Sequence, residues 1–385
     1  MSIRVLLVNS HGTDTTVGGA ERHVGLLADG LAQRGFEVSA LAAFPTVGEP
    51  VPGMRVLHDH DWRVSPRRRA LNHLSDIAAL RRRDLHAAIS DARPDVVHTH
   101  NLPGITTAVW DVAAQRGAAV VHTIHDYYLL CPRVTLMRPD GSTCSPHPLL
   151  CGLRTRRLAR WTDAVSVVVG VSQYVLDRHA QVFPRSRREV LRLATAERMG
   201  PLRPPSPRPR TLGYIGALEH TKGVSRLLED APALGAAGLR LRIAGDGRLR
   251  PDVEAGAARD DHVDYVGRVA GAEKARFFES CDIGLMPSAW AEPGGPNYAV
   301  LEWLEAGRPV LVAATGGLAE AVEHLPGCFA LDPAPDGLAR ATAALTEPDA
   351  WADALSKVSA TRLPSFADWL GAHERIYRSL AEEAR

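Results

Sequence analysis

The feature that most constrains the fold is an alternation of short apolar runs with longer segments of helical period. In the first half of the chain, runs of strand length occupy residues 3–9, 37–43, 95–100, 119–125 and 166–172. Strands that are apolar on both faces are typical of a parallel sheet covered by helices on both sides. The pattern begins again after residue 210, with runs at residues 211–216, 239–245, 263–267, 282–288 and 309–314. The sequence therefore predicts two α/β domains.

A proline-rich segment separates the two repeats. Residues 201–210 read PLRPPSPRPR, and their five prolines exclude a helix or a central strand there. We predict an N-terminal domain over residues 1–200, a linker over 201–210 and a C-terminal domain over 211–364. The tail, residues 365–385, carries one apolar stripe at helical spacing, and we predict a helix that packs back on the N-terminal domain.

The composition is that of an ordinary globular protein. The chain has 385 residues, of which 45% are apolar, so it can bury two cores, and no segment reaches the roughly 18 apolar residues that a spanning helix needs. The N-terminus lacks the basic region and cleavage site of a signal peptide, and the five cysteines are an odd number that does not suit a disulfide framework. We therefore expect a soluble, cytoplasmic protein.

Positive charge is concentrated in the first half of the chain. Residues 1–200 hold 25 Arg against 18 Asp and Glu. This excess suits an anionic partner, such as a phosphate-bearing substrate or a lipid surface, and it equally suits a solvated arginine-rich surface. Residues 62–89 are basic and helical in period, with an apolar stripe of Leu71, Leu74, Ile77, Ala78 and Leu85. Peripheral contact with an anionic membrane is one interpretation of this segment, and we favour a domain helix whose stripe packs inward.

Two glycine pairs follow apolar runs at positions where open α/β sheets bind ligands, beyond the carboxyl ends of the strands. Gly18 and Gly19 open one helix, and Gly294 and Gly295 precede a shorter one. Glycine lets a backbone amide approach an anion closely, and a helix N-terminus adds partial positive charge. Glu302 lies in the middle of the second, apolar helix, where a buried carboxylate needs hydroxyl or amide partners. These loops predict two anion-binding helix termini.

Several motifs occur in a characteristic order along nearly the whole chain. They are GGxE at residues 18–21, strand ends of HxH and HTIHD type, YIGxLxxxKG at 214–223, AGDG at 244–247 and DIGLMPS at 282–288. In these motifs the chain resembles the retaining glycosyltransferases of the GT-B fold, in particular family 4. The resemblance implies two Rossmann-like domains that face each other across a cleft. It also implies a hexosyltransferase-like enzyme that moves a sugar from a nucleoside-diphosphate sugar, above all a UDP-sugar, to a small-molecule or glycan acceptor without a metal or other cofactor.

The resemblance also implies roles for individual residues. The residues that bind the donor would be Gly18, Gly19, Lys222, Gly294, Gly295, Asn297, Tyr298 and Glu302. In this site Gly19 gives its amide to the diphosphate, Lys222 neutralises it, and Glu302 holds the ribose hydroxyls. Glu292 would contact the transferred sugar. His125 would lie beside the reacting centre.

On the acceptor side of the same centre we expect His100 and Asp126. By alternation His98 shares a strand face with His100, and His100, at the loop end, is the pocket residue of that pair. A purely structural role for His125, as a hydrogen-bonded polar residue at a strand end, is the alternative, and its histidine neighbours favour the functional role.

Two departures from the family pattern leave alternatives open. Ala217 stands where the family often has an arginine, and nine residues separate Glu292 from Glu302 where the family usually has seven. A nucleotide-sugar epimerase of similar fold and an inactive sugar-nucleotide-binding protein are therefore retained as alternatives. A nucleic-acid partner is not expected, and the sequence leaves the acceptor and the oligomeric state open.

A separate set of metal-capable residues lies within the first domain. Cys131, Cys144, His147 and Cys151 offer four zinc-capable ligands in a loop-rich segment. Their spacing does not match a standard zinc motif, so we favour plain thiols over a structural zinc.

Overall fold

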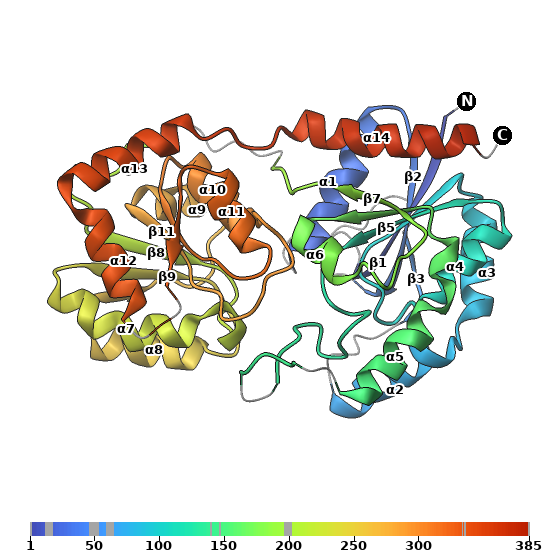
Figure 1. The fold of residues 1–385 in the computed structure, drawn as a ribbon, viewed down its shortest axis with the longest axis horizontal. Helices are drawn as coiled ribbons and strands as arrows, with labels where there is room; N and C mark the ends of the chain where they lie inside the picture. The colour runs from blue at the N-terminus through green and yellow to red at the C-terminus, as the bar shows by residue number, and fades with distance from the viewer. Residues whose placement is uncertain are drawn as a thin grey trace. The chain divides into compact units, whose positions relative to one another are not determined.

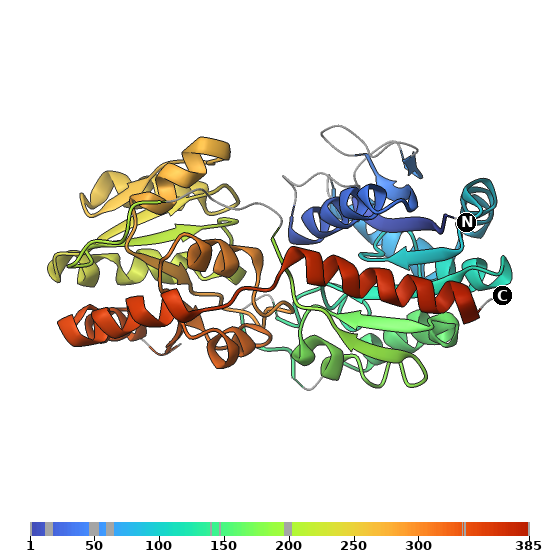
Figure 2. The ribbon, with the colours of Figure 1, turned by 90° about the horizontal axis from the view of Figure 1, so that it is seen from above.

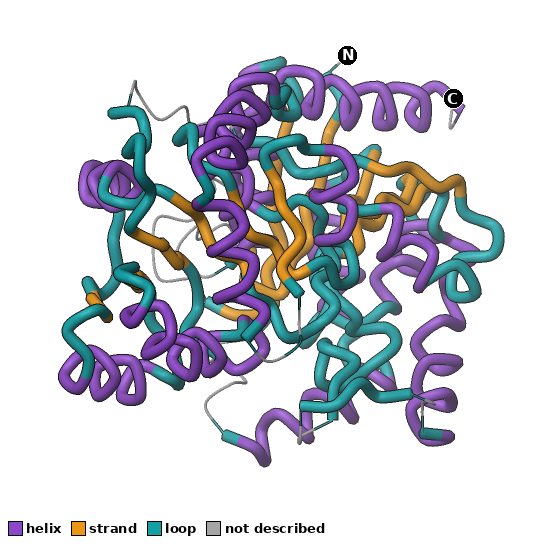
Figure 3. The backbone as a smooth tube through the Cα atoms, turned by 60° about the vertical axis from the view of Figure 1, so that its left-hand side comes forward, coloured by secondary structure: helices purple, strands orange, loops and turns teal. Residues whose placement is uncertain are grey.

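The computed structural model of the chain describes residues 2–11, 18–45, 54–58, 65–138, 141–145, 148–195, 202–332, 334 and 336–383. The chain divides into two compact units (Figure 1). Unit 1 comprises Met1–Leu136, Cys144–Leu193 and Phe366–Arg385, and unit 2 comprises Met137–Thr143 and Ala194–Ser365. Each unit has its own parallel sheet with flanking helices (Figure 3).

Unit 1 is built on seven parallel strands in the order β3-β2-β1-β4-β5-β6-β7. Their bounds are β1 (Arg4–His11), β2 (Glu37–Phe44), β3 (Arg55–Val56), β4 (Val96–Thr99), β5 (Ala119–Ile124), β6 (Val167–Gly170) and β7 (Arg187–Val190). The strand order reverses between β1 and β4, which pair in parallel with Val5 opposite Val96. In such doubly wound sheets this switch point is where ligands bind, beyond the carboxyl ends of the strands.

The helices of unit 1 cover both faces of this sheet. They are α1 (Gly19–Gln33), α2 (Pro66–Ala78), α3 (Arg82–Ala92), α4 (Ala108–Gln115), α5 (Leu149–Leu158), the 3-10 helix η2 (Ala159–Ala164), α6 (Gln173–Arg178) and α14 (Phe366–Glu383). The last of these follows unit 2 in the sequence, yet α14 packs on α1 and β4 of unit 1 (Figure 2). Its buried face carries Trp369, Leu370, Ile376 and Tyr377.

Unit 2 repeats the same topology with six parallel strands in the order β10-β9-β8-β11-β12-β13. The strands are β8 (Thr211–Ile215), β9 (Arg240–Ala244), β10 (Val263–Tyr265), β11 (Ile283–Met286), β12 (Val310–Ala313) and β13 (Cys328–Leu331). The helices are η3 (His220–Lys222), α7 (Val224–Ala236), α8 (Arg250–Arg259), α9 (Gly271–Glu279), α10 (Tyr298–Glu305), α11 (Leu318–His324), α12 (Gly337–Thr346) and α13 (Pro348–Ala360). The switch point lies between β8 and β11.

The predicted fold class is confirmed, since each of the ten apolar runs overlaps a strand of one of these two sheets. The sequence pattern missed β3, β7 and β13, which are all edge strands. Both β3 and β7 begin with arginine, β3 has only two residues, and β7 is largely polar, because an edge strand is not covered on all sides. No described helix is both long and apolar enough to cross a bilayer.

The described part of the proline-rich segment, residues 202–210, has no helix or strand. Its backbone is bound to unit 2, because the amides of Ser206 and Arg210 each donate to the Asp282 carboxylate at 2.8 Å. In addition, the indole of Trp351 donates to the Ser206 carbonyl at 2.9 Å. These residues therefore belong to the compact body of unit 2.

The expected single helix over residues 62–89 is wrong in two respects. Residues 59–64 lie outside the described residues, and the remainder forms two helices because Ala79, with a left-handed φ of 55°, ends α2. The predicted inward packing of the stripe also fails. Leu71 and Leu74 are 65% and 63% exposed, whereas Leu85, on α3, is buried. The physical reason is that Asp76, and not the leucines, anchors α2 to the rest of unit 1.

Candidate functional site

The glycine loop of unit 1 leads into α1 with Gly18 as the N-cap, in an extended conformation, and Gly19 as the first helical residue. Glu21, in the first turn, is buried, and the side-chain amide of Asn9 on β1 donates to its carboxylate at 3.4 Å. A Cβ atom at Gly18 would lie 2.7 Å from Glu21 Oε2, so this glycine leaves room for the carboxylate. The hydrogen bond between Asn9 and Glu21 thus ties β1 to the N-terminal turn of α1, where the helix carries partial positive charge.

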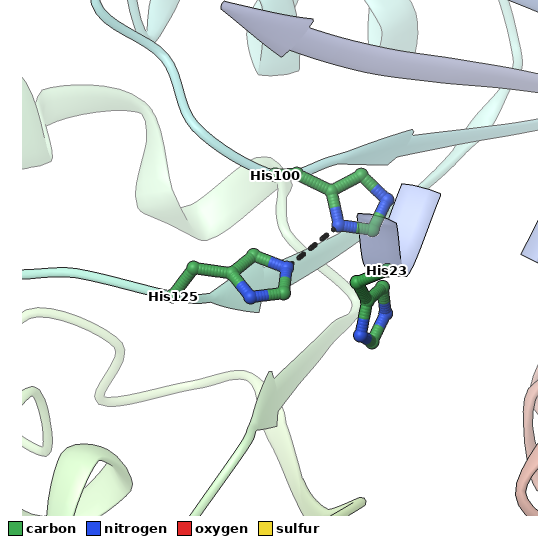
Figure 4. A group of neighbouring side chains, drawn as sticks. All are labelled: His23, His100 and His125. Atoms are coloured by element: carbon green, nitrogen blue, oxygen red, sulfur yellow. Dashed lines mark hydrogen bonds between the residues drawn. The ribbon is translucent and has the colours of Figure 1, made fainter. Parts of the chain in front are cut away.

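Three histidines converge at the carboxyl ends of the central strands of unit 1 (Figure 4). His23 lies on α1, His100 follows β4 and His125 follows β5. His100 Nδ1 and His125 Nε2 are 3.0 Å apart and share a hydrogen bond. The ring of His23 meets the ring of His125 edge-on, with centroids 4.7 Å apart. The predicted residues His100 and His125 therefore belong to one group. His23 is a third member of this group, which the sequence did not predict.

Burial keeps these histidines neutral. Desolvation lowers the pKa of His125 to about 3, and it lowers the pKa of His23 and of His100 well below 6.5. A charged ring in any of the three would also repel charge on its neighbours. A neutral imidazole offers one donor and one acceptor nitrogen. At neutral pH His125 can therefore orient a hydroxyl group without adding positive charge.

The histidine group rests on a buried polar support. His98 Nδ1 lies 2.5 Å from the Tyr377 hydroxyl of α14, and its Nε2 lies 2.7 Å from Thr123 Oγ1. Both ring nitrogens of His98 are therefore used inside the core. Trp369 of α14 contacts His23 edge-on, with ring centroids 4.9 Å apart. No local motif could have revealed Trp369 or Tyr377, because only the return of α14 to unit 1 brings them here.

Asp126 lies next to His125 and lines a small pocket together with His100, His125 and His179. Its carboxylate accepts the Tyr128 amide at 2.8 Å. Desolvation nonetheless raises the pKa of Asp126 to about 6, because burial outweighs this hydrogen bond and the charge of Arg154. The pocket thus combines neutral imidazoles with a carboxyl group that titrates close to neutrality.

Two sets of side chains bear on metal binding. Among the described residues, His23, His100 and His125 form one group whose ligand nitrogens all lie within 4.8 Å of one another, so these residues could hold a transition metal. Of the cysteine set, Cys131 is buried, while Cys144 and Cys151 are half-buried and carry free thiols. His147 lies outside the described residues.

In unit 2 the predicted residues Lys222 and Glu292 form a close ion pair. Lys222, in η3 just after β8, places its Nζ atom 2.6 Å from Glu292 Oε1. The Ser288 hydroxyl donates to the same oxygen at 2.6 Å. Glu292 is only 4% exposed, and a parallel bridge to Gly316 fixes its backbone. The longer spacing to Glu302 therefore leaves this carboxylate in a defined, buried position beside the lysine.

Glu302 has a lysine partner of its own, which the sequence analysis did not identify. The carboxylate lies on α10 and is buried, and its Oε1 accepts a bond from Lys274 Nζ of α9 at 2.6 Å. The structure gives this carboxylate a cationic partner in Lys274. The two residues are 28 positions apart on different helices, so no local pattern joins them. Two buried glutamates of unit 2, Glu292 and Glu302, are thus each paired with a lysine.

The glycine loop of unit 2 is shaped by close backbone packing. A Cβ atom at Gly295 would lie 1.6 Å from the carbonyl oxygen of Gly317, so only glycine fits there. Asn297 is the N-cap of α10 and accepts the Val300 amide at 3.1 Å through its side chain. Gly294 lies within this loop, and Tyr298 is the first residue of α10. The Asn297 side chain therefore has a structural task in capping α10.

The predicted site residues form two groups, one in each unit. Unit 1 contributes Gly18, Gly19, His100, His125 and Asp126, and unit 2 contributes Lys222, Glu292, Gly294, Gly295, Asn297, Tyr298 and Glu302. Each group lies at the carboxyl ends of the strands beside a switch point, which is the position that doubly wound sheets use for ligands.

Two protein families match the chain. The family described as Glycosyltransferase Family 4 matches residues 17–192, and the family described as Glycosyl transferases group 1 matches residues 209–357. An uncharacterized 42.6 kDa protein in the cps region of Klebsiella pneumoniae is 27% identical over 86% of this chain and 90% of its own length. A glycogen synthase of Mycobacterium tuberculosis is 28% identical over 95% of this chain and 92% of its own length.

Solved structures with the same fold cover almost the whole chain. The sucrose-phosphate synthase of Thermosynechococcus elongatus has a TM-score of 0.70 at 18% identity, over 98% of both chains. The Anabaena protein Alr3699/HepE in complex with UDP-glucose has a TM-score of 0.64 at 18% identity, over 97% of this chain and 99% of that one. At this level of identity the likeness establishes the fold, and the family matches carry the relationship.

Proposed function

Because the chain belongs to the family 4 glycosyltransferases, we propose that it transfers the sugar of a UDP-sugar to an acceptor hydroxyl with retention of anomeric configuration and without a metal ion. The observation that carries this proposal is the pairing of Lys222 with the buried Glu292 beside the glycine loop of unit 2. The Anabaena structure in complex with UDP-glucose supports the choice of nucleotide. The acceptor stays unassigned.

The proposed chemistry requires stabilisation of a departing diphosphate. As the bond between the anomeric carbon and the phosphate oxygen breaks, positive charge develops on the sugar and negative charge on UDP. Lys222 and the amides at the N-terminus of α10 would bind the diphosphate, and preorganised groups of this kind usually supply the largest catalytic contribution. A lysine already held in place by Glu292 loses little freedom when the donor binds.

We assign the two glutamates the roles that the family resemblance implies. Glu292 would accept hydrogen bonds from hydroxyl groups of the transferred sugar while it orients Lys222. Glu302, oriented by Lys274, would accept hydrogen bonds from the ribose hydroxyls. The acceptor oxygen would bond to the anomeric carbon on the face that the phosphate leaves, and the acceptor's proton would pass to the leaving phosphate oxygen. Neutral His125 would orient a hydroxyl at the reacting centre.

A ligand screen tests the donor class directly. The melting temperature would be measured with UDP-, GDP-, ADP- and dTDP-sugars, because a ligand that binds only the folded state raises it by mass action. We expect the largest shift with a UDP-sugar and a much smaller shift in the Glu302→Ala variant. A larger shift with another nucleotide would refute the UDP assignment. An equal UDP-sugar shift in Glu302→Ala would refute the ribose contact.

A further inference from the structure

We propose that the surface formed by α2 and α5 of unit 1 docks on a bilayer that contains anionic phospholipid. This inference is independent of the proposed function, because it concerns neither the donor nor the residues of the candidate site. The two helices pack against each other (Figure 1). Their outward faces carry both exposed leucines and exposed arginines.

The apolar part of this surface stands out from the rest of the protein. The exposed large hydrophobic side chains of the described residues are Val56, Leu71, Leu74, Leu80, Leu149, Leu150 and Leu153. All of these except Val56 lie on α2, on the turn that ends it, or on α5. Leu149 and Leu150 are 80% and 77% exposed. Single exposed leucines are ordinary, but five on two adjoining helices, with a sixth on the turn that ends α2, mark an interaction surface.

The fold does not need these leucines, because polar contacts anchor both helices. On α2, the buried carboxylate of Asp76 accepts the Gly104 amide at 2.9 Å and the Tyr128 hydroxyl at 2.8 Å. On α5, the buried guanidinium of Arg154 donates to the Tyr128 carbonyl at 2.6 Å. Thr155 donates to the Leu129 carbonyl at 2.9 Å. The leucines thus remain on the outer faces of two helices that are already fixed.

The charges beside the leucines identify the partner. Arg67 and Arg68 on α2 and Arg156 and Arg157 on α5 are exposed, and none of them forms an ion pair with a described residue. Within residues 65–80 and 148–160 the one acidic residue is Asp76, which is buried. Leucine tips surrounded by arginines are the pattern of helices that lie in the headgroup region of an anionic membrane. A second copy of the same surface would instead set arginines against arginines.

Vesicle co-sedimentation of the full chain tests this docking. Vesicles of phosphatidylcholine alone and vesicles with about one third phosphatidylglycerol are compared at low and high salt, because screening weakens attraction between exposed charges. We expect binding to the anionic vesicles that falls with salt, and little binding to phosphatidylcholine alone. Equal binding to both vesicles, or no binding to either, would overturn the proposal.

Matched variants separate the apolar and the charged contributions. We expect Leu149→Ser/Leu150→Ser and Arg156→Gln/Arg157→Gln each to weaken anionic-vesicle binding on the order of tenfold or more. The controls are Val56→Ser, an exposed apolar residue elsewhere in unit 1, and Arg208→Gln/Arg259→Gln, two exposed arginines of unit 2. Controls that weaken binding as much as the test variants would overturn the assignment of this surface.

Two further readouts complete the test. Light scattering after gel filtration reports the oligomeric state, and a dimer that the leucine variants disperse would show that a second copy, not a membrane, covers the surface. Each variant is also checked for its melting temperature and its UDP-sugar shift. Loss of vesicle binding with an unchanged UDP-sugar shift supports docking. Absence of vesicle binding by a wild-type protein that binds its donor overturns docking alone.

Discussion

Lys222 Nζ lies 2.6 Å from Oε1 of Glu292, and the carboxylate is nearly inaccessible to solvent while the lysine is partly exposed. The buried Glu292 carboxylate has little access to water and therefore needs the ammonium group as its partner, which fixes the position of Lys222. The lysine itself remains accessible to a ligand. The indole ring of Trp290 adds a face for the ammonium group, with the nitrogen 5.3 Å from the ring centroid. The pair therefore presents one oriented positive charge beside the glycine loop of unit 2.

Removal of this charge should reduce turnover more than donor binding. In Lys222→Met we expect kcat to fall on the order of 100-fold, because the negative charge on UDP increases as the sugar departs. Steady-state kinetics with the best UDP-sugar of the ligand screen, together with calorimetric binding of UDP, separates the two effects. Lys357→Met is the control, since Lys357 pairs with Asp353 on an exposed helix face. A higher KM with unchanged kcat would contradict the proposed role.

The pair between Lys274 and Glu302 should contribute to stability as well as to donor binding. Lys274→Met leaves a buried carboxylate without its cation, and we expect the free energy of unfolding to fall by about 2 kcal/mol. The double variant Lys274→Met/Glu302→Gln should recover part of this loss, because no buried charge is then left unpaired. Denaturant unfolding measures both values. Additive losses in the double variant would show that the two residues do not act as a pair.

The central strands were predictable from the sequence, and the partners of the buried glutamates were not. Apolar runs fix the central strands because both faces of a parallel sheet are covered, as in β5 and β11. The edge strand β7, RREV, lacks that signal. Lys274 meets Glu302, and Trp369 meets His23, only through tertiary packing. The exposure of Leu71 and Leu74 was not predictable either, because α2 is anchored by Asp76, whose hydrogen-bond partners Gly104 and Tyr128 lie on other segments.

If sugar transfer needs no metal ion, a chelator should not inhibit it. If fixed amides and Lys222 stabilise the diphosphate, an excess of EDTA should leave the rate of sugar transfer unchanged. The rate is measured as UDP release with and without the chelator. A loss of activity that Mg²⁺ or Mn²⁺ restores would contradict the metal-independent mechanism. A loss that only Zn²⁺ restores would point to a zinc site, either at the group of His23, His100 and His125 or at the set of Cys131, Cys144, His147 and Cys151.

Stability should decrease as the pH falls below 6.5, because the buried histidines resist protonation. Desolvation lowers the pKa of His23 well below 6.5 in the folded state, so the unfolded chain binds a proton there that the folded protein does not. This contribution to stability is complete above pH 6.5 and is lost as the pH falls through the range below it. The neighbouring histidines act with the same sign, whereas Asp126, with its pKa raised to about 6, acts with the opposite sign.

The variant His23→Leu isolates one member of this group. His23 is fully buried, and its two ring nitrogens have no hydrogen-bond partner among the described residues, so leucine removes little at neutral pH. We expect the unfolding free energy at pH 7.5 to change by about 1 kcal/mol or less. Between pH 6.5 and 5 its decline should be shallower than in the wild type by up to about 1.4 kcal/mol per pH unit, the effect of one proton. Denaturant unfolding at several pH values measures this slope. The control is His324→Leu, at an exposed histidine, which should leave the pH dependence of the unfolding free energy unaltered. If His23→Leu also leaves it unaltered, His23 is protonated in the folded protein.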